Sequence, residues 1–284
     1  MEALKVMAWN INQQGRQWRN KQKKDGEIPL WITEQIPNDV NVVVFTEFNC
    51  HAENILDFYD ALEKQGFSYA TTNHSCAWAN DVLIAVRGKK AKIDAVTYEK
   101  AYPDTHDTNS SIDWDMIPEN LRIDISVNGK CVHLWGIRIK DLGGNYQLRK
   151  AEMETVMCWL RKVKGTKVLM GDFNNLRENT IEESWNISVL DGLIGSAFER
   201  KTPKENHSWG VSLNEDDNSF DGYIKNDHLI HSTDIKKARV EPTYKWDYLV
   251  NCEYSLKDAK YGKRALDIKV THPDHGILFG ELII

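Results

Sequence analysis

Several short polar segments of this sequence could bind a cation or a phosphate, and one of them follows directly after an apolar run. The run KVLM at residues 167–170 continues into GDFNN at residues 171–175. In extended chain, Asp172 and Asn174 point to the same side, so a carboxylate and an amide would face one spot. A plain turn uses the same residue types, because Gly and Asn are common turn formers. This segment alone therefore leaves a turn and a ligand site both open.

Four other apolar strands or near-strands also end in acids, amides and histidines. These residues are Asn10 with Asn12, Glu47, Asp227 with His228, and Asp274 with His275. If the five segments met at one edge, their oxygen atoms would suit a hard divalent cation, Mg²⁺ or Mn²⁺. The pairs His228 with His231 and His272 with His275 could instead be zinc ligands, although no cysteine is near them in the sequence.

The elements that would position these residues are many short strands with a few helices between them. Apolar or alternating runs predict strands at residues 4–10, 42–48, 67–71, 82–86, 92–98, 121–127, 131–139, 167–170, 228–231, 235–241, 246–250 and 276–283. Helical spacing predicts helices at residues 29–36 and 53–64, one around residues 153–163, and one ending near Arg200. Polar loops are expected at residues 99–120 and 201–226. The pattern indicates one α+β domain over residues 1–284, with two stacked sheets and helices outside.

Composition narrows the class of protein. The net charge of −6 argues against a protein that coats nucleic acid by bulk attraction, though a local basic patch is compatible with it. The 5 cysteines are scattered and lack CxxC spacing, which favours reduced thiols. No apolar run approaches the ~20 residues of a membrane span, and the first strand leaves no room for a signal peptide. We therefore expect a soluble, cytoplasmic monomer that binds no membrane.

Five blocks, in chain order, resemble the signature motifs of a known superfamily. MAWNIN, VVFTEFN, MGDFNN, KNDHLIHS and THPDHGIL are similar to those of the endonuclease/exonuclease/phosphatase superfamily, the deoxyribonuclease I-like fold. The resemblance implies a four-layered α/β sandwich, in which two stacked, mostly antiparallel sheets are flanked by helices. It places the active site at the mouth between the two sheets.

The resemblance also implies a role for each polar residue. Glu47 corresponds to the principal Mg²⁺ ligand, assisted by Asn10, while Asn12 stands where many relatives have Asp, so we expect a second metal position to be weaker here. Asp172 corresponds to the residue that orients or deprotonates the attacking water, and Asn174 to an amide that holds the phosphate.

The histidine motif completes this set. His275 corresponds to the histidine near the scissile phosphate, Asp227 to its orienting carboxylate, and Asp274 to a neighbour of the metal or of His275. Whether Asp172 or His275 is the base stays open.

Arg138, in LWGIRIK, departs from the family pattern, which usually has His or Tyr at this strand end. A guanidinium can bind two phosphate oxygens at once but cannot donate a proton. The alternative is a surface arginine in an ion pair.

A basic loop and one tryptophan are the candidate substrate contacts. Arg16, Arg19, Lys21, Lys23 and Lys24 surround Trp18 just after the first strand. Such a loop suits a nucleic acid strand, although a merely solvated loop would have the same composition. Trp209, in HSWG, stands where many relatives have a substrate-facing aromatic, and core packing is its alternative.

The sequence therefore predicts a Mg²⁺-dependent phosphodiesterase, an intracellular nuclease with DNA as the favoured substrate. A small-molecule or lipid phosphoesterase of the same superfamily is the alternative enzyme, and a catalytically silent binding module is the alternative of another class. The PxWCDR block of inositol-polyphosphate phosphatases is absent, and Ile224 replaces the aromatic expected in abasic-site endonucleases.

Overall fold

The computed structural model describes most of the chain. The described residues are 3–12, 27–72, 80–88, 92–97, 118–141, 145–175, 185–214, 217–250, 252, 254–260, 263–268 and 272–284. The basic loop predicted to bind nucleic acid, with Arg16, Trp18, Arg19, Lys21, Lys23 and Lys24, lies outside the described residues, as does most of the predicted loop at residues 99–120.

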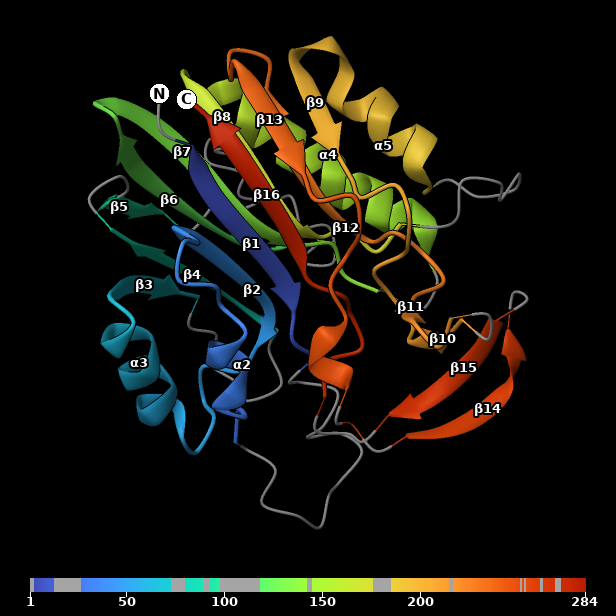
Figure 1. Ribbon diagram of the computed structural model, residues 1–284. Coiled ribbons are helices and arrows are strands. Elements are labelled where there is room, and N and C mark those ends of the chain that lie inside the picture. Colours follow the sequence, from blue (N-terminus) through green and yellow to red (C-terminus); the bar gives the residue numbers. More distant parts are fainter. Residues whose placement is uncertain are drawn as a thin grey trace, which may run out of the picture.

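Within the described residues, two six-stranded sheets form the body of the molecule (Figure 1). The first has the order β13-β16-β1-β2-β4-β3, with β1 at Leu4–Asn10, β2 at Val42–Phe48, β3 at Phe67–Thr71, β4 at Asp81–Arg87, β13 at Lys237–Val240 and β16 at Leu278–Ile283. The second has the order β5-β6-β7-β8-β12-β9, with β5 at Lys92–Thr97, β6 at Glu119–Val127, β7 at Lys130–Arg138, β8 at Thr166–Asp172, β9 at Phe198–Lys201 and β12 at Asp227–Ser232. In both sheets the central pair is parallel, β1 with β2 and β7 with β8, and the other neighbours are antiparallel.

The period-2 alternation of the strands separates the two faces of each sheet. Val6 and Val44 of the first sheet belong to the same buried cluster as Leu134 and Val168 of the second, and this cluster is the core between the sheets. The intervening residues of the strands face outward, where helices cover them.

Helices lie on the outer face of each sheet (Figure 1). α2 (Trp31–Glu34) and α3 (Ile55–Lys64) cover the first sheet, and α4 (Tyr146–Lys162) and α5 (Ile187–Ile194) cover the second. The predicted four-layered α+β sandwich is therefore confirmed. No helix in the described part of the chain is long and apolar enough to cross a membrane.

Three predictions about the elements were wrong. The helix expected to end near Arg200 stops at Gly195, whose φ of 60° ends α5, and after the 3-10 turn Gly195–Ala197 the chain enters β9. The strand expected at residues 246–250 is a 3-10 helix at Asp247–Leu249. The predicted polar loop at residues 201–226 contains two strands of a third sheet.

This third sheet has the order β11-β10-β15-β14 and was missed. Its strands are β10 (Ser212–Leu213), β11 (Phe220–Asp221), β14 (Tyr254–Lys260) and β15 (Lys263–Ile268). Figure 1 shows the β14–β15 hairpin at the side of the two main sheets.

Candidate functional site

The candidate residues continue the inner faces of the two sheets at the edge where the core ends. Even-numbered inner positions of β1, β7 and β8 lead from the core to Asn10, Arg138 and Asp172, and odd-numbered inner positions of β12 lead to Asp227. β12 runs antiparallel to β8 and pairs Asp227 with Asp172, so its first residue lies beside the last residue of β8. Asp227 thus begins a strand, and His275 precedes β16, where the sequence had suggested strand ends.

Glu47 reaches this mouth through an irregularity. Val43 and Phe45 point outward, so simple alternation would direct Glu47 into the helix layer. The pairing of β2 with β4 shifts register between Phe45 and Phe48, and Glu47 has a φ of 51°. Such a bulge redirects a side chain and is typical of functional sites. Here it places the Glu47 carboxylate against Asn10 and Arg138.

The GDFN segment is both a strand end and a tight turn. Asp172 is 1% exposed, and its Oδ1 accepts a hydrogen bond of 2.8 Å from the Asn174 backbone N–H. Asn174 has a φ of 44°, and its Nδ2 donates to the Ile139 carbonyl at 2.7 Å and to Asp172 Oδ2 at 3.1 Å. Both Asn174 amide hydrogens are therefore used within the protein, and the predicted phosphate contact would require one of them to be released.

Asn10 connects the acids of the two sheets. Its Nδ2 donates to Asp172 Oδ2 at 2.8 Å and lies 3.2 Å from Glu47 Oε1. Its Oδ1 accepts from the Asn12 backbone N–H at 2.9 Å, which sets the orientation of the amide. Asn10 thus holds both acids in place and presents an oxygen beside Glu47.

His275 lies between two aspartates. Its Nδ1 donates to Asp227 Oδ2 at 2.8 Å, and its Nε2 lies 4.0 Å from Asp172 Oδ2. The His275 carbonyl accepts hydrogen bonds from Trp9 Nε1 and Tyr248 Oη, both at 2.8 Å, so its backbone is fixed as well. The three side chains form a cluster with ligand atoms within 4.8 Å of one another.

Burial and mutual charge shift the pKa values of this cluster. Burial acts to lower the pKa of His275, but the negative charges of Asp227 and Asp172 outweigh it and raise the pKa above its ordinary value. Burial raises the pKa of Asp172, and the charge of Asp227 adds to this while His275 and Arg138 oppose it. Burial would also raise the pKa of Glu47, but Arg138 and His275 hold it below its ordinary value. The geometry therefore favours an imidazolium and an ionised Glu47.

Arg138 is not a surface residue. It is 8% exposed, with Nε and Nη2 at 2.8 and 2.7 Å from Glu47 Oε1 and Nη1 at 2.8 Å from Glu119 Oε2. The sequence reasoning missed Glu119. The two-residue turn Asn128-Gly129 sets a register that pairs Glu119 with Arg138, and Glu119 continues the inner alternation of Leu121. Both signals are in the sequence.

Solved structures share this architecture over nearly the whole chain. An endonuclease/exonuclease/phosphatase family protein from Bacteroides thetaiotaomicron has a TM-score of 0.64 at 16% identity, with 99% of this chain and 98% of that chain covered. The chain has the endonuclease/exonuclease/phosphatase fold.

Two further structures of this fold are similar. The mannosyl-6-phosphatase from B. thetaiotaomicron has a TM-score of 0.65 at 16% identity, covering 99% of this chain and 100% of that chain. D. rerio TDP2 complexed with a single-strand DNA product has a TM-score of 0.57 at 11% identity, covering 99% of each chain. By sequence, no family model and no curated protein matches this chain.

The residues at the mouth of the endonuclease/exonuclease/phosphatase fold fit a divalent cation. No hydrogen bond from the described residues reaches Glu47 Oε2, and Asn10 Oδ1 lies on the residue beside it with one lone pair still available. Two side-chain oxygens, Asn226 Oδ1 and Asp227 Oδ1, are buried without a hydrogen-bond partner in the described part of the molecule. Oxygen ligands of this kind suit Mg²⁺, which keeps several waters.

Of the remaining predicted residues, some border the site and others lie away from it. Asn12 has a φ of 46°, and its Nδ2 donates to Asp274 Oδ1 at 3.0 Å, so these two predicted metal ligands contact each other. Trp209 is half-buried, and its backbone bridges to that of His275, so it borders the site. His228 lies on the other face of β12, where Nε2 contacts Asn175 Oδ1 and Nδ1 contacts Thr202 Oγ1, both at 2.7 Å. His228 and His231 stand three residues apart on β12 and so point to opposite faces of the sheet, which prevents them from binding one zinc ion together.

Two buried charged residues of helix α4 contact the backbone next to the site. Arg149 Nη1 donates to the Asn174 carbonyl at 2.8 Å, and Arg149 also pairs with Asp141. Glu152 is fully buried and accepts from the Lys140 backbone N–H at 2.8 Å. Burial raises the pKa of Glu152 to about 8. These contacts hold the chain segments that follow β7 and β8.

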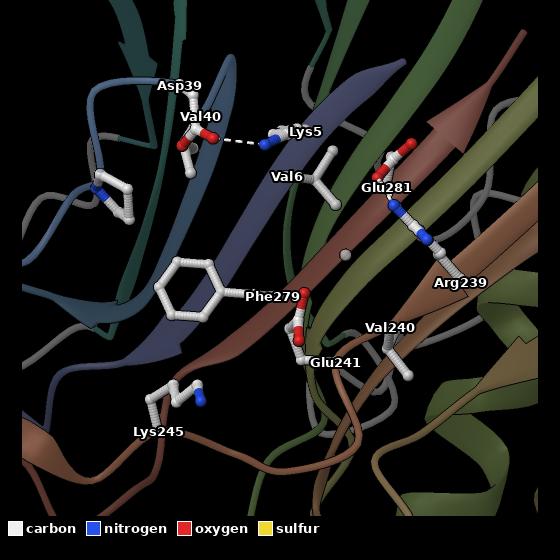
Figure 2. Close-up of a pocket in the computed structure, with 12 residues that line it drawn as sticks. Lys5, Val6, Asp39, Val40, Arg239, Val240, Glu241, Lys245, Phe279 and Glu281 are labelled. Carbon is white, nitrogen blue, oxygen red and sulfur yellow. Dashed lines mark hydrogen bonds and ion pairs between the residues drawn. The ribbon is translucent and has the colours of Figure 1, made fainter.

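A pocket of about 300 Å³ lies elsewhere, on the outer face of the first sheet. Figure 2 shows Phe279 and Val240 below the ion pairs Lys5–Asp39 and Arg239–Glu281 in this view. None of the candidate site residues lines it. Lys5 and Asn10 stand near opposite ends of β1, roughly 17 Å apart at ~3.3 Å per residue. The pocket is therefore separate from the mouth.

Proposed function

We propose that this protein is a Mg²⁺-dependent phosphodiesterase that acts as a cytoplasmic nuclease on DNA. The observation that carries the proposal is the buried Asp172–His275–Asp227 cluster, which lies directly beside Glu47 and Asn10 at the mouth of the two sheets. Glu47 Oε2 and Asn10 Oδ1 would hold the ion. When bound, a divalent cation neutralises charge on the phosphate and lowers the barrier to in-line attack.

The side chains divide the proton chemistry between them. An imidazole between two carboxylates is held as imidazolium, so His275 has no lone pair with which to take a proton from water. Its Nε2–H is suited to donate to a phosphate oxygen and to stabilise the charge that develops there. Asp172 is the remaining buried carboxylate in contact with His275, and we assign it the activation of the attacking water. Asp227 orients His275 and fixes its tautomer.

Two observations support a nucleic acid substrate. The similar D. rerio TDP2 structure contains a single-strand DNA product. The basic segment around Trp18 follows directly after β1, whose last residue is Asn10. Basic side chains with an aromatic ring suit a phosphate backbone and its bases.

A phosphomonoesterase acting on a small sugar phosphate is the second candidate. The similar mannosyl-6-phosphatase has the highest TM-score of the three structures compared. The net charge of −6 also disfavours long-range attraction of polyanions. The same mouth chemistry would serve either substrate.

Hydrolysis of three substrates tests these candidates. Each assay follows one product, with Mg²⁺ and with EDTA. The products are nicked DNA from a plasmid, p-nitrophenol from bis(p-nitrophenyl) phosphate, and phosphate from mannose 6-phosphate. We expect Mg²⁺-dependent cleavage of the first two, reduced at least ~10³-fold by Glu47→Gln, because an amide is a poor ligand for a hard cation. Glu34→Gln, an exposed residue of α2, is the matched control and should have wild-type rates.

The outcomes separate the candidates. Release of phosphate from mannose 6-phosphate alone would favour the second candidate. No turnover of any substrate by a folded, metal-bound protein would indicate a silent binding module, and full activity in EDTA would contradict the metal-dependent proposal.

One further variant tests the nucleic acid contact. Neutralising Arg19, Lys21, Lys23 and Lys24 together should weaken DNA binding and flatten its salt dependence, by roughly one unit of log–log slope for each lost phosphate contact. Hydrolysis of bis(p-nitrophenyl) phosphate should hardly change. Equal loss of both activities would show that this segment serves the fold or the chemistry instead.

A further inference from the structure

Arg138 occupies one oxygen of the residue that would bind the metal. Glu47 Oε1 is 2.8 Å from Arg138 Nε, 2.7 Å from Nη2 and 3.2 Å from Asn10 Nδ2. The hydrogen bonds from Arg138 Nε and Asn10 Nδ2 use both lone pairs of this carboxylate oxygen, so none is left for a cation. Glu47 Oε2 has no such partner among the described residues, so a cation can reach Glu47 through this atom alone.

Glu119 keeps the guanidinium in this place. It stands opposite Arg138 in the β6–β7 pairing, and its Oε2 accepts from Nη1 at 2.8 Å. Both partners are largely buried, with side-chain exposures of 15% for Glu119 and 9% for Arg138. An unpaired charge in such surroundings is costly in free energy, so the position of the guanidinium between the two acids is strongly favoured.

The charges at this corner also matter for a cation. Glu47, Glu119 and Arg138 together carry one net negative charge, where two carboxylates alone would carry two. A fixed positive charge beside a cation site lowers the affinity for the first divalent ion and opposes a second one. Arg138 therefore supplies the positive charge that a second ion would bring to these carboxylates, and unlike an ion it cannot dissociate.

We infer that Arg138, positioned by Glu119, is a built-in cation that restricts the mouth to a single divalent ion bound through Glu47 Oε2. The inference rests on the metal site of the proposed function. It assigns Arg138 to the control of metal stoichiometry and affinity, in place of the phosphate clamp that the sequence had suggested, because three of its N–H groups already face protein carboxylates.

Mn²⁺ binding, followed by the loss of the free-ion EPR signal in the absence of substrate, tests this inference. Wild type should bind one ion. Arg138→Met should bind at least about tenfold more tightly or take up a second ion, because a positive charge is removed and Glu47 Oε1 is freed. Arg138→Lys, which keeps the charge, should remain at one ion and covers the case in which the Met variant does not fold.

Glu119→Gln should shift affinity in the opposite direction. It removes a negative charge and leaves the guanidinium to Glu47 alone, so Mn²⁺ binding should weaken. The matched control is Arg122→Met, which removes a charge from the same hairpin at a residue paired with Asp124, outside the site, and should bind like wild type.

Arg138→Met and Glu119→Gln are expected to change the Mn²⁺ affinity in opposite directions. A merely structural role would instead weaken Mn²⁺ binding in both variants. Weaker or unchanged binding by folded Arg138→Met would overturn the inference while leaving the metal site of the proposed function intact. No Mn²⁺ binding by wild type would overturn the metal site and this inference with it.

Discussion

Gly171→Ala should destabilise the protein strongly, since this glycine stands opposite Ile137 in the parallel pair of β7 and β8 and an added side chain would clash there. Its φ of 140° lies in a region that L side chains rarely adopt, and an added Cβ would lie 2.0 Å from the Ile137 carbonyl oxygen. Real Cβ contacts are essentially never below 3.0 Å, so β7 or β8 must move by about 1 Å. Backbone strain and overpacking each cost about 1–3 kcal/mol, which gives a loss of roughly 3–5 kcal/mol.

Urea unfolding followed by tryptophan fluorescence measures this loss. Gly192→Ala is the control, because no atom lies within 4 Å of its Cβ position inside α5, and the better helix propensity of Ala should stabilise by up to ~1 kcal/mol. Ile137 and Gly171 precede Arg138 and Asp172, so hydrolysis should fall even at temperatures where Gly171→Ala remains folded. A loss below ~1 kcal/mol would refute the reasoning, because it would show that the strands separate at little cost.

Two other predictions concern buried charges. Burial raises the pKa of Glu152 from 4.5 to about 8, so its contribution to stability is present below pH 4.5 and is lost as pH rises through 8. Glu152→Gln should therefore gain stability relative to wild type as pH rises from 5 to 9, by a few kcal/mol at about 1.4 kcal/mol per pKa unit. If the urea midpoints of variant and wild type changed equally with pH across this range, the prediction would be contradicted. His275→Ala and Asp227→Ala should each reduce kcat strongly, and the double variant should lose little more than one alone, because the pair acts as a unit. Additive losses of kcat would show that the pair does not.

Much of the fold follows from local pattern, because the buried strands carry their own signal. Alternating apolar residues on strands such as β1, β2 and β8 separate a sheet–sheet core from a helix-covered face, and this period is visible in the sequence. The polar residues after these runs were recognisable for the same reason. A carboxylate directly after a buried strand must lie at the edge of the core.

The misses have specific causes. β14 carries two exposed apolar residues, Tyr254 and Leu256, on a small side sheet, and its apolar alternation ends there, too short to mark a buried strand. The segment at Trp246–Val250 has the composition of a strand, but Trp246 and Leu249 turn to the same core as a 3-10 helix, where spacing by three aligns side chains. Gly195 was a readable helix stop that was overlooked.

Glu47 illustrates what pattern alone cannot supply. Its motif was recognisable, but alternation along β2 would send its side chain outward. The register shift that turns it inward depends on how β2 pairs with β4, which is a property of the assembled sheet. The position of the proposed cation ligand therefore depends on long-range pairing.

The site draws on equivalent places in two similar halves. In each half a parallel strand pair is followed by an antiparallel neighbour, β1-β2-β4 in the first sheet and β7-β8-β12 in the second. Glu47 is the penultimate residue of the second parallel strand of one half, and Asp172 is the last residue of that strand in the other. The first half provides Glu47, the proposed cation ligand, and the second provides Asp172 of the His275 cluster. Asn10 donates to both acids, so this one amide links Glu47, the proposed cation ligand, to Asp172, the proposed proton acceptor, across the interface between the sheets.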